Sequence, residues 1–145
     1  MSENVTGYEE VAAAIADACR GPSGTPHERQ ASAALLAAAI HREMAALVRA
    51  LHREELVDAN LFENGATVTL RQNGVSVEVQ RLSGQHRLRV EMYGFDASLV
   101  PPGQRVTQGD VAARTVEECG VLARAFVQAI GNLIRQESIR RGRSQ

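Results

Sequence analysis

The sequence has no lysine and no tryptophan, so all sixteen of its basic residues are arginine. Codon bias in a GC-rich bacterial or phage genome explains the use of arginine in place of lysine. Escape from lysine-directed modification, and a preference for the bidentate anion contacts of guanidinium groups, remain alternatives. The net charge of −1 argues against a dedicated high-affinity nucleic-acid binder, because such proteins are usually basic as a whole.

Signals for export, membrane insertion and metal binding are also missing. The polar, acidic segment Met1–Thr6 is neither a secretory nor a transit signal, and no apolar run approaches the length that spans a bilayer. Cys19 and Cys119 are too far apart in the chain to fit a metal or redox motif. We therefore expect a soluble, cytoplasmic protein with reduced thiols, no membrane association and no bound metal.

Catalytic signatures are equally scarce. The chain has no G-x-S-x-G nucleophile elbow, and the glycine-containing loop 21–24 lacks the lysine of a phosphate-binding loop. His41 and His52 share a helix face but lie about 16 Å apart along its axis, so one metal ion could bridge them only between chains. The sequence therefore predicts no catalytic and no cofactor-binding residue, and an enzyme would need a site at a dimer interface.

Residues 66–93 have the alternating pattern of a three-stranded antiparallel meander. Its two turns, Asn73-Gly74 and Ser83-Gly84, both have the composition of two-residue hairpin turns. Because both turns place the same apolar residues on one face, we expect them to define the register. The predicted cross-strand pairs are Val68–Val79, Leu70–Val77, Val79–Leu88, Val77–Val90 and Val75–Met92.

The opposite face of the meander is polar, and we expect it to face water. Glu78 and Arg89 are predicted to lie opposite each other there as a complementary pair. The apolar face must be covered, and helical patterns flank the meander on both sides. The predicted fold class is α+β, with the order helix, helix, three-stranded antiparallel meander, helix. Long helices cover one face of the sheet in a single domain that spans residues 1–145.

Capping and stop signals set the helix boundaries. Thr25 and Glu28 form a capping box, and Asn64-Gly65 provides a C-terminal stop for the same helix. Thr107 and Asp110 are predicted to cap the last helix. The predicted helices span 7–20, 25–62 and 107–140, and residues 141–145 are predicted to form a mobile tail.

The second predicted helix is too long for a compact globule of this size, so it either bends or projects and packs against another chain. It measures roughly 50 Å, against a diameter of about 38 Å for a globule of this size. An apolar stripe along it is therefore predicted to stay uncovered and to form the interface of a two-fold homodimer. The stripe consists of Leu36, Ile40, Met44, Leu47 and Leu51.

Arginines on the polar sheet face and near the end of the chain form a candidate anion-binding set. No exposed aromatic residues are interleaved with them to stack bases, so nucleic-acid binding is only weakly indicated. The set consists of Arg71, Arg87, Arg89, Arg140, Arg141 and Arg143.

Short segments in and after the meander carry a resemblance to a known family. They are Val68-Thr69-Leu70 followed by Asn73-Gly74, then Val90-Glu91-Met92, and Asp96-Ala97-Ser98-Leu99 before a helix. With the order of long helix, meander and closing helix, they resemble the YbaB-type nucleoid-associated family over about residues 30 to 137. The resemblance implies a small dimer that binds DNA. The chain departs from the family in its additional N-terminal helix, its Pro101-Pro102-Gly103 segment and its lack of lysine.

The function expected first is a non-enzymatic protein-interaction module, such as an adaptor, chaperone or assembly factor, acting as a homodimer. A DNA-associated regulator of the YbaB-like type is an alternative, which salt-dependent DNA binding would identify. A small enzyme with a site around His41 or His52 at a dimer interface is another, which metal analysis would test. No cofactor is expected.

Overall fold

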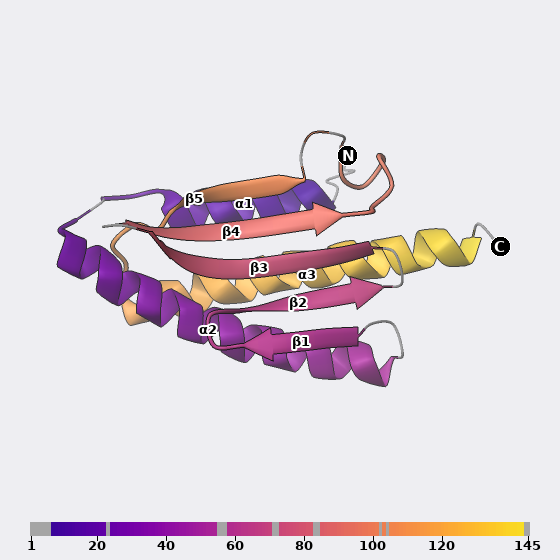
Figure 1. Cartoon of the computed structure of the whole chain (residues 1–145), viewed down its shortest axis with the longest axis horizontal. Helices are drawn as coiled ribbons and strands as arrows, with labels where there is room; N and C mark the ends of the chain where they lie inside the picture. The colour runs from indigo at the N-terminus through magenta and orange to yellow at the C-terminus, as the bar shows by residue number, and fades with distance from the viewer. Residues whose placement is uncertain are drawn as a thin grey trace.

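The described part of the chain forms three helices and one open antiparallel sheet of five strands (Figure 1). The computed structural model describes residues 7–22, 24–54, 58–70, 73–82, 85–101, 103 and 105–143. The predicted mixture of helix and sheet is confirmed, but the sheet has five strands where three were predicted. In chain order the elements are α1 (Gly7–Cys19), α2 (Pro26–Arg53), β1 (Asp58–Phe62), β2 (Gly65–Leu70), β3 (Asn73–Leu82), β4 (Gln85–Tyr93), β5 (Val106–Asp110) and α3 (Val116–Arg143).

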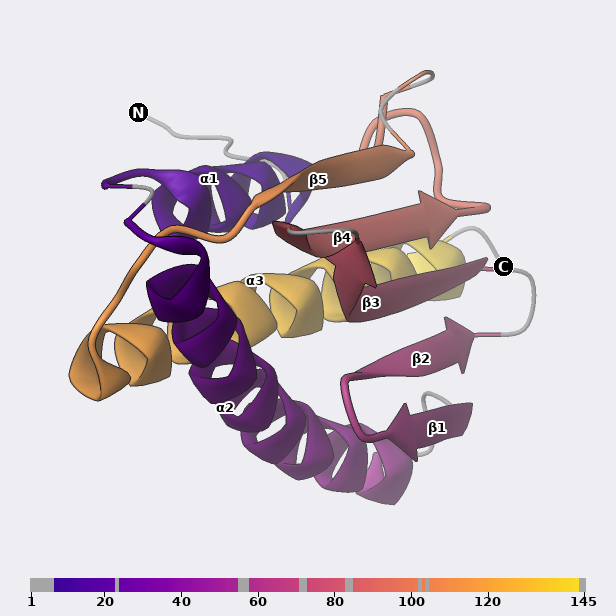
Figure 2. The same ribbon diagram turned by 60° about the vertical axis from the view of Figure 1, so that its left-hand side comes forward.

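All three helices lie on the same face of the sheet (Figures 1 and 2). In Figure 2, α3 passes between α1, which lies near β5, and α2, which crosses toward β1. The buried apolar residues of β2, β3 and β4 point toward these helices, whereas the described residues that alternate with them are mostly partly exposed. The buried set consists of Ala66, Val68, Val75, Val77, Val79, Leu88, Val90 and Met92. The largest fully buried side chains include Phe126, Leu36, Ile40, Met44, Leu51, Leu88, Met92, Ile130, Leu133 and Ile134.

The predicted register is correct for one hairpin and wrong for the other. Between β3 and β4, Val77 pairs with Val90, as predicted. Between β2 and β3, Val68 pairs with Val75 and not with Val79, so the strands are offset by four residues from the prediction. An even offset keeps every side chain on its predicted face, which explains why the polar and apolar faces were nevertheless predicted correctly.

The Asn73-Gly74 pair begins β3 and so does not form a turn. Residues 71–72, between β2 and β3, and the predicted Ser83-Gly84 turn lie outside the described residues. Asn73 is buried, and its side-chain amide donates a hydrogen bond to the carbonyl of Gly94. Any side chain at Gly74 would collide with the ring of Tyr93. This glycine is therefore required by close packing within the sheet and not by a turn.

The predicted capping box at the start of α2 is confirmed. The Glu28 backbone N–H donates to Thr25 Oγ1 over 3.1 Å, and the Thr25 N–H donates to Glu28 Oε1 over 2.8 Å. The predicted end of this helix is wrong, because α2 ends at Arg53 and residues 58–62 form the edge strand β1. Asn64-Gly65 consequently does not stop a helix but lies where β1 turns into β2.

The last helix also differs from the prediction at both ends. Residues 106–110 form β5, so Thr107 and Asp110 do not cap a helix. The N-cap is Thr115, whose N–H donates to Glu118 Oε1 over 2.9 Å and whose hydroxyl accepts from the Glu118 N–H over 3.2 Å. The helix continues through Arg143, which removes most of the predicted tail; residues 144–145 lie outside the described part of the chain.

The predicted uncovered stripe on α2 is covered by the chain itself. Leu36, Ile40, Met44 and Leu51 are at most 2 % exposed, and Leu47 is partly buried against the core. The prediction was wrong because α2 is shorter, and the sheet wider, than the sequence suggested. Among the described helices α2 has the length and hydropathy that could cross a membrane, but core helices of soluble proteins share these properties.

Replacing Val77 with Asp tests the assignment of the buried sheet face. Val77 is fully buried, so the Val77→Asp variant should lose about 3–5 kcal/mol of unfolding free energy by burying an uncompensated carboxylate. The neighbouring Glu78→Gln variant keeps an acceptor on the polar face and should change stability little. Urea denaturation measures both, and equal midpoints for the two variants would contradict the assignment.

Candidate functional site

The two histidines considered for an interchain metal site have different surroundings. His41 Nδ1 lies 3.0 Å from the carbonyl oxygen of Phe62 and so ties α2 to the end of β1. His52 is exposed near the end of α2. Within the described ranges, no three His, Cys, Asp or Glu side chains converge in a way that could hold a metal ion.

The described arginines of the candidate anion-binding set all have carboxylate partners. Arg87 lies 3.4 Å from Asp110, and Arg89 lies 3.3 Å from Glu91. Arg89 is opposite Glu78 in the register, as predicted, but its guanidinium contacts Glu91. Both of these arginines on the polar sheet face are therefore paired with acidic residues. Arg71 lies outside the described residues, and so do the side chains of Arg141 and Arg143.

The sixth member of that set, Arg140, is held near the end of α3. Its guanidinium contacts both carboxylate oxygens of the fully buried Glu137, at 3.2 and 2.7 Å. It also lies 3.9 Å from Asp96, in the segment that follows β4. The hydrogen bonds to Glu137 raise the pKa of Arg140 above its usual value. Arg140 therefore joins α3 to this segment, and anion binding by the set stays a prediction.

The edge strand β1 is the most exposed strand of the sheet. It pairs only with β2, and no described strand pairs with its other side (Figure 1). Leu61 and Phe62 are consecutive and 41 % and 37 % exposed, whereas the opposite edge strand, β5, has one exposed large apolar residue, Val106. An open strand edge with exposed apolar side chains is a template for pairing with another chain.

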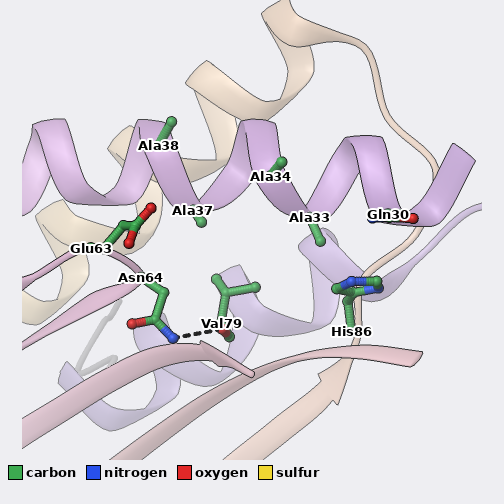
Figure 3. Close-up of a pocket in the computed structure, with 9 residues that line it drawn as sticks. All are labelled: Gln30, Ala33, Ala34, Ala37, Ala38, Glu63, Asn64, Val79 and His86. Carbon is green, nitrogen blue, oxygen red and sulfur yellow. Dashed lines mark hydrogen bonds between the residues drawn. The ribbon is translucent and has the colours of Figure 1, made fainter. Parts of the chain in front are cut away.

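A cleft of about 580 Å³ separates the N-terminal half of α2 from the sheet (Figure 3). Ala33 and Ala37 point from α2 toward Val79 of β3, and their small side chains leave the space open. The cleft is lined by Gln30, Ala33, Ala34, Ala37, Ala38, Glu63, Asn64, Val79 and His86.

His86 stands at one end of this cleft, on β4 (Figure 3). Both of its ring nitrogens are buried, and neither has a hydrogen-bond partner in the described part of the protein. Its ring also borders a second hollow of about 270 Å³, which lies on the side of α1 and β5. That hollow is lined by Cys19, Gly21, Arg29, His86, Asp110, Val111 and Ala112.

The second hollow brings together a thiol, an imidazole and a carboxylate, the residue types of a nucleophilic triad. The groups are not connected, however, because His86 bonds to neither Cys19 nor Asp110, and Asp110 accepts from Arg87. Burial, and secondarily the charge of Asp110, raise the pKa of the Cys19 thiol. Nucleophilic catalysis needs a thiolate, so this arrangement does not activate Cys19.

Sequence reasoning treated His86 as a residue at the rim of the sheet, and it missed its position facing the helices. The register does place it opposite Arg81, near the end of the β3–β4 hairpin. His86 lies an even number of residues before Leu88 and Val90, whose side chains point toward the helices, so it shares their face of the sheet. The alternation of side chains along the strand could therefore have predicted this polar group on the apolar face.

No protein-family model, curated protein or solved structure that was compared with the chain matches it. The likeness to the YbaB-type family therefore stays a prediction from the sequence.

Thiol reactivity tests whether Cys19 could act as a nucleophile. In the native protein, Cys19 and Cys119 should react with iodoacetamide at about pH 7.5 at least about tenfold more slowly than free cysteine, because burial raises both pKa values. The rates should increase as the pH approaches the raised pKa values. Mass spectrometry of each peptide measures the rates, with denatured protein as the control. Rapid modification of native Cys19 would contradict the argument.

Proposed function

We propose that the protein is a cytoplasmic, non-enzymatic interaction module that associates with a second copy of itself through β1. The single observation that carries the proposal is the open edge of β1 with its two exposed apolar residues, Leu61 and Phe62. An adaptor, chaperone or assembly factor uses such a surface without needing an activated nucleophile or a cofactor.

The hydrogen-bond pattern of β1 supports edge-to-edge pairing. Phe62 and Gly65 flank the two-residue turn between β1 and β2 and pair with each other. Hydrogen-bonded pairs alternate along an antiparallel ladder, so the N–H and C=O groups of Ala59 and Leu61 point away from β2. A second β1 strand in antiparallel orientation would satisfy these groups on both copies, which gives a two-fold interface and a continuous sheet.

The interface proposed at first, along the stripe Leu36–Leu51, is replaced by this edge because the stripe is buried within the chain. Neither alternative function gains an observation in its favour. The DNA-associated regulator depends on arginines, and the described members of that set contact carboxylates. The small enzyme depends on a dimer-interface site around His41 or His52, and His41 contacts the Phe62 carbonyl whereas His52 is exposed on α2.

Light scattering coupled to gel filtration tests the dimer. Wild-type protein at micromolar concentration should have twice the chain mass of 15.6 kDa, about 31 kDa. The Leu61→Glu variant should be a folded monomer, because a charge on an exposed edge strand opposes strand pairing.

The matched control is Val121→Glu, which makes the same chemical change at a 62 % exposed position on α3, away from β1. This variant should remain a dimer with an unchanged circular dichroism spectrum. A monodisperse wild-type monomer would overturn the proposal, and so would a Leu61→Glu dimer as stable as that of wild type.

A further inference from the structure

We propose that the outward face of α2 binds an acidic α-helix of another protein. This face carries three arginines, Arg42, Arg49 and Arg53, which would meet carboxylates at matching positions on the bound helix. The inference rests on the proposed function, since it names the partner of an interaction module. It uses a helix face and not the open edge of β1, so the two surfaces can be tested separately.

The three arginines form one row along the helix, called here the arginine row. Arg42 and Arg49 are seven residues apart, about two turns, and Arg53 follows about one turn later. All three are exposed, whereas the buried residues of α2, such as Ile40 and Met44, lie on the opposite side of the helix. The arginine row therefore points away from the core over roughly 16 Å of the helix axis.

No described group neutralises the arginine row. The side chains of Arg42, Arg49 and Arg53 have no ion pair or hydrogen bond in the described part of the chain. The positions of α2 three and four residues away, from which a side chain could reach them, hold alanines, His52 or another arginine of the row. Most other arginines with described side chains are bound to carboxylates, namely Arg20, Arg87, Arg89, Arg114, Arg135 and Arg140.

The glutamates next to the row in the sequence do not cancel its charge. Glu43 and Glu54 each directly follow an arginine of the row, and sequence neighbours on a helix do not face each other. Glu54 is already bound to Arg135 of α3 over 3.1 Å. Arg49 and Arg53, four residues apart, repel each other in the free protein. A carboxylate of another chain placed between them would remove this repulsion.

The surface around the arginines has the shape that a second helix requires. Ala38 points away from the sheet in Figure 3, and Ala46 is exposed between Arg42 and Arg49. Small side chains let two helices approach closely. The outward residues also alternate in spacings of four and three, the pattern by which helices pack along each other. They are Ala31, Leu35, Ala38, Arg42, Ala45 and Arg49.

An acidic protein helix fits this face better than a nucleic acid or a membrane does. The whole chain has a net charge of −1, so it lacks the positive field that attracts a polyanion. A membrane-surface helix inserts Trp, Phe or several Leu residues. The largest apolar residue of this face is Leu35, which is 37 % exposed. A short acidic helix needs only the local charge of the arginine row.

A fluorescein-labelled synthetic peptide of three EAALEAA heptads is a suitable probe, because its glutamates recur at spacings of seven and four residues. Fluorescence anisotropy should give a dissociation constant of about 0.1 mM at about 20 mM salt. At about 300 mM salt the constant should rise at least about fivefold, because exposed ion pairs are screened. The same peptide with glutamine in place of glutamate should bind at least about tenfold more weakly.

Protein variants locate the peptide on the arginine row. Arg49→Gln should weaken binding about two- to threefold, and the triple change of Arg42, Arg49 and Arg53 to Gln at least about tenfold. These positions are exposed, so the circular dichroism spectrum should not change. The matched control is Arg105→Gln, at an exposed arginine before β5 that also has no ion pair in the described part of the chain, and it should bind like wild type.

The Leu61→Glu variant separates this inference from the dimer. It should bind the peptide like wild type, whether or not wild-type protein dimerises, because the arginine row is not part of β1. Loss of peptide binding by a folded Leu61→Glu variant would place the binding site at β1 and overturn the inference.

Three further results would also overturn it. The first is an unchanged anisotropy at about 1 mM wild-type protein, roughly ten times the expected dissociation constant. The second is undiminished peptide binding by the folded triple variant. The third is tighter binding of a short DNA duplex or of phosphatidylserine vesicles than of the peptide, at equal concentrations of anionic groups, which would assign the face to a nucleic acid or a membrane.

Discussion

One face of the sheet carries the apolar side chains of the three central strands, and the need to keep this face from water determines where the helices lie. β3 and β4 contribute fully buried residues such as Val77 and Val90. α1, α2 and α3 all pack on this side, and the other face remains polar with balanced ion pairs. The alanines of α2 leave a cleft against the sheet near its N-terminal half. The cleft is thus a consequence of how the sheet is covered.

The sequence allowed the faces of the central strands to be predicted, but not every register. Alternation defines which residues share a face, and Val77 and Val90 follow it. It does not distinguish registers that differ by an even number of residues, so Val68 was matched with the wrong partner. In the register observed, Asn73 and Gly74 belong to β3 and pair with Leu70 and Thr69 of β2. The turn predicted at Asn73-Gly74 rested on the composition of this dipeptide alone.

The edge strands and the candidate site were harder to predict, for different physical reasons. β1 and β5 are short and mostly exposed, so neither has the apolar alternation that marks a half-buried strand. The capping box of Thr115 and Glu118 was visible in the sequence and favours a helix start at Thr115 over one at Thr107. The cleft depends on the distance between α2 and the sheet, which no local pattern encodes. Of the polar residues that line the cleft, His86 alone could have been placed on the apolar face from the sequence, because it lies an even number of residues before Leu88.

The order of the elements along the chain has a consequence for biosynthesis. Each strand pairs only with its sequence neighbours, so the sheet can form over short loops as the chain emerges from the ribosome. α3 is made after all five strands, and it supplies Phe126, Ile130 and Leu133 to the core. Until its 28 residues are released, the nascent sheet exposes the face that they protect. Aggregation then competes with completion of the core, and general chaperones would act during this interval.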